Sequence, residues 1–381
     1  MRICIVYDCL FPHTVGGAER WYRNLAGRLA AGGHEVTYLT LRQWEQGAEP
    51  DAPDGVRVLA VGPRMRLYTS SGRRRILPPV VFGLGVLAHL LRRGRAYDVV
   101  HTASFPYFSL LAVGAVRPLA RFAVVVDWHE VWSAGYWREY LGAVGGSAGR
   151  AVQLLCARIP QRAFCFSHLH AQRLREEGLR GEVSVLEGQY AESLATPTVQ
   201  EVQPIVVFAG RLIPEKRALL AVAAFAAASQ RIPGLRGELY GQGPEHGAVL
   251  AAIAERGLTG ALSAPGFVPA STLDTALRNA MCMLSTSRRE GYGMIVVEAA
   301  ARGTPSIVVA GEDNAATELI VEAVNGTIAT SAEASVVADA IVRVHDAGVE
   351  LRCSTARWFA GNSARLSMDA SLERVLEVYT A

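Results

Sequence analysis

Residues 188–204 read GQYAESLATPTVQEVQP, a polar stretch without hydrophobic periodicity. It interrupts a chain that otherwise alternates short apolar runs with alanine-rich and amphipathic segments, which is the pattern of an α/β protein. A polar segment with prolines is typical of a connection between domains. We therefore predict that the sequence forms two domains and that this segment joins them.

Strand-like runs precede and follow this connection. In the first half they are expected at Arg2–Asp8, Glu35–Thr40, Val56–Val61, Asp98–Ala103, Phe122–Asp127, Ala163–Ser167 and Val183–Leu186. Helical patterns such as Ala18–Ala31 and Val80–Leu91 separate several of them. In the second half, strands are expected at Ile205–Ala209, Gly237–Tyr240, Met281–Thr286, Ser306–Ala310 and Gly326–Ala329. Continuous apolar, β-branched strands are typical of parallel sheets, which are buried on both faces.

Each series predicts a Rossmann-like domain, which we place at residues 1–190 and 204–355. In open parallel sheets, ligands bind beyond the carboxyl ends of the strands. Two facing domains of this kind would therefore place a ligand site in the cleft between them.

The composition fits two folded domains. The chain has 381 residues, of which 50% are hydrophobic, enough for two sizeable cores. Its net charge of +3 conceals a division, because residues 1–190 carry 23 basic against 15 acidic side chains, whereas residues 191–381 carry 15 against 20. A basic first half favours an anionic acceptor or an anionic membrane surface. Nucleic acid is not expected as a partner, because no basic stripe with interleaved aromatic residues occurs.

Cysteine usage and the first residues indicate a reducing compartment. The six cysteines are scattered without a C-x-x-C pair, so a disulfide framework or a zinc site is not expected. Because the chain starts with a strand-like segment, no signal peptide is expected. It has no apolar run of the roughly 18 residues that a spanning helix needs. We therefore expect a cytoplasmic protein.

The turn after the first expected strand could bind an anion. Gly16 and Gly17 lie between that strand and the helix expected from Ala18. Backbone N–H groups at a helix N-terminus form a ready anion site. A tight turn without a ligand explains the double glycine equally well.

The second domain opens with VVFAGRLIPEKR, residues 206–217. A strand is expected to end at Ala209, and Arg211 and Lys216 follow it. Lys216 is the only lysine of the chain, whereas the other 37 basic residues are arginine. A compact ammonium group beside a guanidinium suits the several oxygens of a diphosphate. An exposed loop cation is the alternative.

Two carboxylates lie eight positions apart in REGYGMIVVE, residues 289–298. Glu290 precedes a helix expected from Met294 to Arg302, and Glu298 lies inside it. A glycosidase also uses two carboxylates, but one of them must protonate a poor leaving group. A diphosphate leaves as a stabilised anion and needs cations and N–H donors instead. We therefore expect both carboxylates to accept hydrogen bonds from sugar hydroxyl groups, with a purely helical role for Glu298 as the alternative.

Together these residues resemble the retaining glycosyltransferases of the GT-B fold, in particular glycosyltransferase family four. The resemblance is carried by the Glu290 and Glu298 pair, by the Gly210-Arg211 and Glu215-Lys216 motifs, and by the segments GGAE (16–19), YGQGPE (240–245) and ERVLEVY (373–379). It covers nearly the whole chain. It implies an α/β GT-B fold, with two Rossmann-like domains facing each other across a cleft and a terminal helix, residues 360–381, that joins the first domain.

The resemblance also implies a nucleotide-diphosphate sugar as donor, UDP- or GDP-linked, with no further cofactor. The implied donor-binding residues are Gly16, Gly17, Arg211, Lys216, Phe267, Val268, Glu290, Gly293, Met294, Ile295 and Glu298. Arg211 and Lys216 would neutralise the diphosphate. Glu298 would hold the ribose hydroxyl groups, and Glu290 would face the donor sugar. The implied acceptor is a hydroxyl group of a saccharide, a glycolipid or a small aglycone.

Further roles implied by the resemblance concern the backbone and the base. Amides of residues 293–295 would face phosphate or sugar, and the base would lie near Phe267 and Val268. The catalytic residues implied are His129, Glu290, Arg211 and Lys216. His129 stands in VVVDWHEVW (124–132), beside Asp127 and Glu130, and would bind or polarise the donor sugar. Local hydrogen bonding is the alternative for this histidine.

Two parts of the chain fit the family pattern less well. Residues 187–190 read EGQY where the family often has Asn-Gly-Val-Asp, and the segment GEDNAATEL, with Asp313 and Asn314, resembles a donor-side loop only weakly. No D-x-D triplet occurs, and that motif holds a divalent metal on the diphosphate in other glycosyltransferases. A metal-independent mechanism is therefore expected.

Competing interpretations remain at this stage. A GT-B epimerase or phosphorylase, and a nucleotide-sugar-binding protein without turnover, would share the same motifs. An oxidoreductase is disfavoured, because neither half contains G-x-G-x-x-G.

Two segments could concern the acceptor. Trp128, Trp132, Tyr136 and Tyr140 lie four residues apart and would form one aromatic face if helical. Core packing and a stacking wall for a sugar are both compatible with that pattern. An apolar stretch between Arg73–Arg75 and Arg92–Arg95 could contact an anionic membrane, or it could be an ordinary helix with arginines at its ends.

Overall fold

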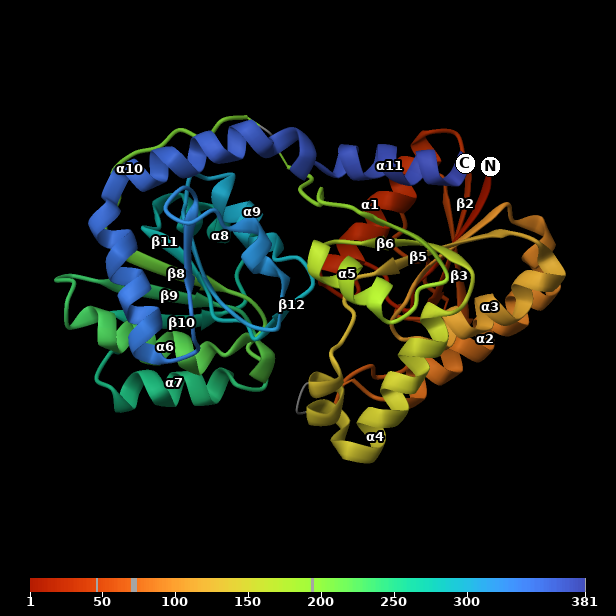
Figure 1. The fold of residues 1–381 in the computed structure, drawn as a ribbon, viewed down its shortest axis with the longest axis horizontal. Helices are drawn as coiled ribbons and strands as arrows, with labels where there is room; N and C mark the ends of the chain where they lie inside the picture. The colour runs from red at the N-terminus through yellow and green to blue at the C-terminus, as the bar shows by residue number, and fades with distance from the viewer. Residues whose placement is uncertain (46, 70–73, 193–194, 381) are drawn as a thin grey trace. The chain divides into compact units, whose positions relative to one another are not determined.

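The structure is a computed structural model that describes residues 1–45, 47–69, 74–192 and 195–380. It divides into two compact units, each built on a parallel sheet (Figure 1). Unit 1 contains the described residues as far as Gln189 together with the segment from Asp369 onward, and unit 2 runs from Tyr190 to Met368. Arg73, which belongs to the predicted basic flank, and Ser193 and Leu194, which belong to the predicted connection, lie outside the described residues.

The sheet of unit 1 has the order β3-β2-β1-β4-β5-β6-β7, and all its neighbouring strands are parallel. Its strands are β1 Arg2–Val6, β2 Glu35–Leu41, β3 Val56–Gly62, β4 Val99–Ala103, β5 Ala123–Trp128, β6 Gln161–Cys165 and β7 Gly181–Val185. The central strands β1 and β4 are almost fully buried, because helices cover both faces of a parallel sheet. The edge strands β3 and β7 are only partly buried.

The helices of unit 1 connect successive strands, except that its last helix arrives from the far end of the chain. They are α1 Gly17–Ala31, α2 Leu77–Arg93, the short 3-10 helix η1 Gly94–Ala96, α3 Phe108–Ala120, α4 Ala134–Ala157, α5 His168–Glu176 and α11 Met368–Thr380. Helix α11 is tied to the sheet by a 2.6 Å hydrogen bond between Tyr379 Oη and His101 Nδ1. No helix among the described residues is long and apolar enough to cross a membrane.

The main sheet of unit 2 has the order β10-β9-β8-β11-β13-β15 and is also parallel. Its strands are β8 Ile205–Ala209, β9 Arg236–Tyr240, β10 Leu262–Gly266, β11 Cys282–Ser285, β13 Ser306–Val309 and β15 Gly326–Ala329. A separate two-stranded ladder pairs β12 Arg289–Glu290 with β14 Asp313–Asn314.

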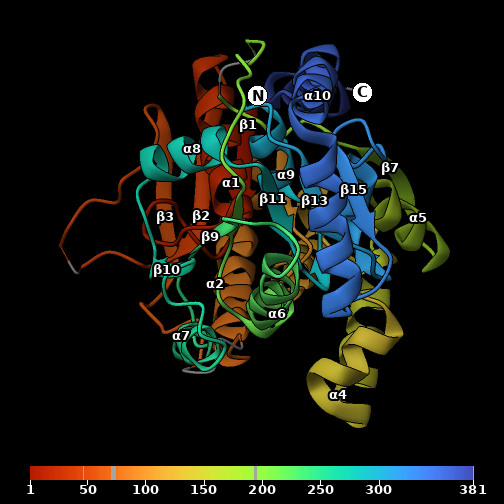
Figure 2. The same cartoon turned by 90° about the vertical axis from the view of Figure 1, so that its left-hand side faces the viewer.

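Helices surround this second sheet. They are the 3-10 helix η2 Pro214–Lys216, α6 Ala218–Ser229, α7 His246–Glu255, α8 Ala270–Asn279, α9 Met294–Ala300, the 3-10 helix η3 Ala315–Leu319 and α10 Ala334–Leu366. Helix α10 is kinked at Gly348, where φ is 56°, and it lies beside β15 and α6 (Figure 2). The buried core of unit 2 consists of strand residues such as Val206 and Leu284 packed against helix residues such as Phe225 and Ile341.

The prediction of an α/β protein with two Rossmann-like sheets is confirmed. Several strands differ from expectation, among them the unpredicted β12 and β14, and two of the differences have an identifiable reason. Strand β7 begins earlier, at Gly181, where φ is 146° and a Cβ atom would lie 1.8 Å from the carbonyl oxygen of Gln161. Strand β10 was not predicted, because its sequence LSAPG contains a proline, which sheets tolerate only at edges and bulges. It is indeed an edge strand.

Candidate functional site

The turn that carries Lys216 is held in place by backbone hydrogen bonds to the next turn along the sheet. Gly210 N donates to Tyr240 O at 3.0 Å, and Leu212 N donates to Gln242 O at 3.0 Å. This approach requires glycine at Gly241 and Gly243, because added Cβ atoms would lie 1.8 Å from Gly210 O and 2.2 Å from Leu212 O, respectively. The YGQGPE segment therefore supports the turn after β8 from behind.

Lys216 and Glu290 form an ion pair at the carboxyl edge of the unit 2 sheet. Lys216 ends the 3-10 helix after β8, and its carbonyl oxygen accepts a 2.8 Å hydrogen bond from Thr286, directly after β11. Ser287 Oγ donates to Glu290 Oε1 at 2.7 Å. Both charged side chains are partly exposed to solvent, Lys216 by 22% and Glu290 by 14%. The structure thus brings together two residues 74 positions apart that the sequence had assigned to one site.

The environment keeps Glu290 ionised. Burial alone would raise the pKa of this carboxyl group. Attraction to Lys216 and hydrogen bonds from Lys216 and Ser287 outweigh that effect and lower the pKa below its ordinary value. Glu290 is therefore a hydrogen-bond acceptor and not a proton donor at neutral pH.

The glycine before α9 is required by its conformation. Gly293 has φ of 103°, and a Cβ atom there would lie 2.6 Å from Ala316 Cβ. The helix begins at Met294 as predicted but ends at Ala300 and not at Arg302. Gly303, with φ of 70°, and the hydrogen bond from Thr304 N to Ala299 O turn the chain into β13. Glu298 lies in the last half of α9 and is partly buried.

Arg211, Phe267 and Val268 lie beyond other strand ends of the same sheet. Arg211 follows β8 and is exposed. Phe267 directly follows β10 and is 72% exposed, which is unusual for an aromatic side chain. Its neighbour Gly266 accepts a 2.9 Å hydrogen bond from Gly241 N, which joins the end of β10 to the turn beside Lys216.

Two residues near Glu290 were missed or underrated by sequence reasoning. Ser287, which orients the carboxylate, carries no motif signal. Asn314 pairs with Glu290 in the β12–β14 ladder and donates through Nδ2 to Ser287 O at 3.0 Å and to Val309 O at 2.8 Å. The weak resemblance of GEDNAATEL was the only available signal for this loop.

In unit 1, the double glycine stands at the start of α1. Gly17 is the first residue of the helix, one position earlier than predicted, and Gly16 caps it in an extended conformation. A Cβ atom at Gly16 would lie 2.3 Å from Glu19 Oε2. The carboxylate of Glu19 therefore folds back onto the turn, which keeps the helix start compact.

His129 follows β5 and is held between aromatic rings. Its ring stacks on Phe166 with centroids 4.6 Å apart and meets Tyr22 edge-on at 5.8 Å. Burial lowers its pKa to about 4 despite the opposing charge of Asp127, so the imidazole is neutral at neutral pH. Its Nε2 atom is buried and has no hydrogen-bond partner among the residues that the structure describes.

The acidic residues beside His129 in the sequence bind other side chains. Asp127 accepts hydrogen bonds from Trp21 Nε1 at 2.7 Å and from His101 Nε2 at 2.8 Å, and Glu130 accepts one from Trp132 at 2.8 Å. His101 lies on the neighbouring strand β4, in register with Val125, two residues before Asp127. Only the pairing of strands brings it to Asp127, so no local sequence pattern predicts this contact.

The aromatic residues near His129 do not form one helical face. Trp128 ends β5 and Trp132 precedes α4, so only Tyr136 and Tyr140 of the predicted stripe lie on the helix. Trp132 and Tyr136 are buried and meet edge-on, with centroids 4.8 Å apart. The stripe is chiefly packing. In the described part of the chain, no group of three or more metal-ligating side chains gathers.

Family models match both units. The model described as Glycosyltransferase Family 4 matches residues 15–187, and the model described as Glycosyl transferases group 1 matches residues 191–354. The two matches meet close to the boundary between unit 1 and unit 2. No curated protein matches the sequence.

Solved structures share the architecture over the whole chain. Sucrose-phosphate synthase from Thermosynechococcus elongatus superposes with a TM-score of 0.79 and 18% identity, covering 100% of this chain and 98% of that one. HepE from Anabaena, in complex with UDP, gives 0.73 and 18% identity with 100% of both chains covered. WaaG, a glycosyltransferase involved in lipopolysaccharide biosynthesis, gives 0.73 and 16% identity, also with 100% of both chains. At these identities the likeness concerns the fold.

Proposed function

Because the chain is a GT-B glycosyltransferase, we propose that it moves a hexosyl group from a UDP- or GDP-linked sugar to a hydroxyl acceptor. In this proposal the anomeric configuration is retained and no metal ion takes part. The acceptor is a saccharide, a glycolipid or a small aglycone. The observation that carries the proposal is the partly open Lys216–Glu290 ion pair at the carboxyl edge of the unit 2 sheet.

Lys216 supplies charge to the leaving diphosphate. An ammonium group has three N–H donors, and Glu290 takes one of them. The other two can bind phosphate oxygens, and the exposed Arg211 adds a second cation after the same strand. Cations already placed where negative charge develops on the leaving diphosphate stabilise the transition state directly.

Glu290 acts by accepting hydrogen bonds from the donor sugar. A carboxyl group whose pKa is lowered cannot protonate a leaving group at neutral pH. This favours a diphosphate leaving group over glycosidase chemistry. Glu298, which lies in α9 eight positions after Glu290, is assigned to the ribose hydroxyl groups. The exposed ring of Phe267 offers a surface on which the base can stack.

His129 is proposed to bind the donor sugar as a neutral imidazole. Its pKa of about 4 means that it carries no charge across the physiological pH range. The buried Nε2 atom, unpartnered in the described structure, is available to a hydroxyl group. Its aromatic neighbours Phe166 and Tyr22 fix the ring plane.

The choice between UDP and GDP is supported on one side by a structural neighbour. HepE was solved in complex with UDP and with UDP-glucose. A donor panel decides the question for this chain. Purified protein is mixed with UDP- and GDP-linked sugars, and the released nucleoside diphosphate is measured. Tight binding without release from any donor would favour the non-catalytic alternative.

Metal independence has its own test. The sequence lacks the D-x-D triplet, and Lys216 with Arg211 can supply the charge that a metal would supply. We expect turnover to be unchanged, within about twofold, after treatment with a chelator. Loss of turnover that added magnesium or manganese restores would contradict this part of the proposal.

We also propose that the enzyme is cytoplasmic and contacts the inner face of an anionic membrane through α2. Leu77, Leu84 and Leu91 are exposed and recur every seven residues, so they share one side of the helix. Between Gly55 and Val126 the sequence has one acidic residue, Asp98, among many arginines. Sedimentation with phosphatidylglycerol vesicles, but not with phosphatidylcholine vesicles, is the expected result, and Leu84→Glu should abolish it. Equal sedimentation with both vesicle types would contradict it.

A further inference from the structure

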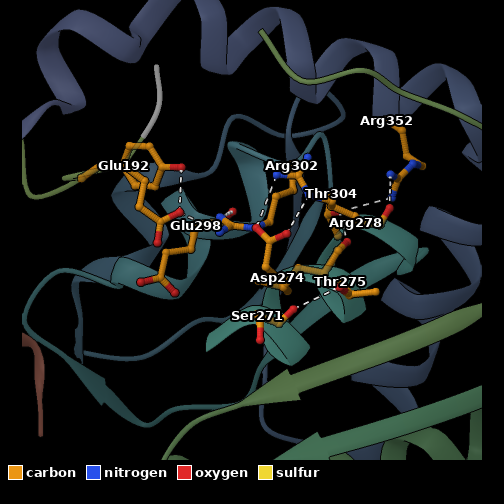
Figure 3. A network of polar contacts seen from close by, with 11 residues as sticks. Glu192, Ser271, Asp274, Thr275, Arg278, Glu298, Arg302, Thr304 and Arg352 are labelled. Carbon is orange, nitrogen blue, oxygen red and sulfur yellow. Dashed lines mark hydrogen bonds and ion pairs between the residues drawn. The ribbon is translucent and has the colours of Figure 1, made fainter. Parts of the chain in front are cut away.

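An arginine after α9 binds the end of that helix. Arg302 Nη1 donates to the carbonyl oxygen of Glu298 at 2.7 Å. Its Nε donates to Asp274 Oδ1 at 2.7 Å, and its Nη2 donates to Glu192 Oε2 at 2.7 Å. The side chain is 7% exposed. Hydrogen bonds from three nitrogens to three segments of the chain fix the plane of the guanidinium group (Figure 3).

The partners of Arg302 are themselves held. Asp274 lies on α8 and also accepts a 2.8 Å hydrogen bond from Arg278 Nε. Glu192 lies near the beginning of unit 2 and takes a longer, 3.4 Å hydrogen bond from Tyr190 Oη. Burial alone would lower the pKa of Arg302, but the two carboxylates outweigh this and raise it. The cation therefore remains charged at the C-terminal end of α9, where the helix dipole favours positive charge.

Helix α9 needs such support. It has seven residues, and helices of this length are not stable without tertiary contacts. Its start is determined by the left-handed Gly293. Its end is determined by the hydrogen bond from Arg302 to the main chain of Glu298, the residue assigned to the ribose. Fixing that carbonyl group fixes the Cα atom from which the carboxylate projects.

We propose that Arg302 is a positioning residue for donor binding, which it favours by holding the main chain of Glu298. This inference rests on the proposed function, in which Glu298 binds the ribose hydroxyl groups. Arg302 does not contact the donor in this account. Its effect on nucleotide affinity passes through Glu298.

Unit 2 offers a matched control in Arg352. This arginine is also buried, and it also binds main-chain carbonyl groups at a helix end, donating to Arg278 O at 2.8 Å and to Ala280 O. Those carbonyls belong to the end of α8 and not to α9 (Figure 3). Replacing Arg352 therefore removes a guanidinium that binds helix-end carbonyls, together with its 3.2 Å bond to Thr304 Oγ1, without removing a contact to Glu298.

The experiment is a calorimetric titration with UDP, and separately with GDP, of five proteins. They are the wild type, Arg302→Ala, Arg352→Ala, Glu298→Ala and the double variant Arg302→Ala/Glu298→Ala. We expect Arg302→Ala to weaken nucleotide binding roughly ten- to a hundredfold, the range that a misplacement of about 1 Å produces. Arg352→Ala should lower Tm but leave Kd within about twofold. In the Glu298→Ala background, removing Arg302 should have no further effect on Kd.

Two further variants keep the test decisive if Arg302→Ala does not fold. Arg302→Lys retains the charge but cannot reach three partners, so binding should weaken by an intermediate amount. Glu192→Gln weakens only the exposed end of the network and should weaken binding by about two- to threefold. Unchanged Kd in both variants would overturn the inference.

The remaining outcomes separate the inference from the proposed function. Loss of affinity on removing Arg302 that persists in the Glu298→Ala background would show that Arg302 acts by another route and would overturn the inference alone. Wild-type protein that binds neither UDP nor GDP would contradict the proposed function itself.

Discussion

In unit 1 Arg74 is paired with Asp8, which follows β1; in unit 2 Lys216 is paired with Glu290, which follows β11. Both pairs lie beyond the carboxyl ends of parallel strands. Asp8 is fully buried, and the guanidinium of Arg74 lies over the rings of Tyr68 at 5.8 Å and Phe105 at 5.4 Å.

We infer from the contrast that one pair is structural and the other functional. A guanidinium between aromatic rings and a buried carboxylate has a fixed plane and few ways to move. The ammonium of Lys216 can rotate its three donors, and both members of its pair remain partly exposed. We infer that the first pair fastens a loop onto the sheet and that the second offers charge to a ligand.

The largest effect is expected from breaking the pair in unit 1. Arg74→Met should lower the free energy of unfolding by about 3–5 kcal/mol, because it leaves the carboxylate of Asp8 buried without its partner. Urea denaturation measures the change. The double variant Arg74→Met/Asp8→Leu should recover most of the loss, since a buried pair replaced as a whole costs little. If the free energy of unfolding of Arg74→Met lay within about 1 kcal/mol of the wild-type value, the proposed difference between the two ion pairs would be contradicted.

Breaking the pair in unit 2 should affect turnover instead. Lys216→Ala should lower kcat about 10²- to 10³-fold, as removal of a transition-state charge partner does. The free energy of unfolding should change by no more than about 1 kcal/mol, because the pair is partly solvated. Lys216→Arg, which retains the charge, should keep more activity than Lys216→Ala. Turnover by Lys216→Ala at the wild-type rate would refute the charge role.

The smallest effect is a pH dependence that distinguishes the wild type from Glu290→Gln. The pKa of Glu290 in the folded protein lies below its value in the unfolded chain. Its ion pair therefore contributes stability above the unfolded pKa and loses that contribution as the pH falls through the folded pKa. The stability difference between wild type and Glu290→Gln should shrink between about pH 5 and pH 3, by about 1 kcal/mol or less. If the stability difference between wild type and Glu290→Gln did not change with pH, the ionised form of Glu290 would contribute nothing to stability.

More of the contacts of the candidate site in unit 2 than of the one in unit 1 could be predicted from the sequence, for a physical reason. Lys216 and Glu290 lie in motifs whose strand, turn and helix are local, so each side chain could be placed from its immediate neighbours. His101 reaches Asp127 only because β4 and β5 pair in register, which a local pattern does not reveal. Arg302 was also missed, because its three hydrogen-bonding partners come from segments as far as 110 positions away.

The same limit explains the errors in secondary structure. Proline in LSAPG argues against a strand in a local analysis, but an edge position leaves its missing N–H group without consequence. Likewise, Asp127 stands two residues before His129 but forms hydrogen bonds with Trp21 and His101, which lie 106 and 26 positions away in the sequence.

The bond between His101 and Tyr379 has a consequence for biosynthesis. The two residues lie 278 positions apart, and all of unit 2 is encoded between them. A ribosome that adds about 5–20 residues per second delivers Tyr379 roughly a quarter of a minute to a minute after His101. Unit 1 thus begins first and is completed after unit 2. During that interval the sheet of unit 1 lacks helix α11. In a chain interrupted before Asp369, the apolar surface of unit 1 that α11 covers would remain exposed to chaperones and proteases.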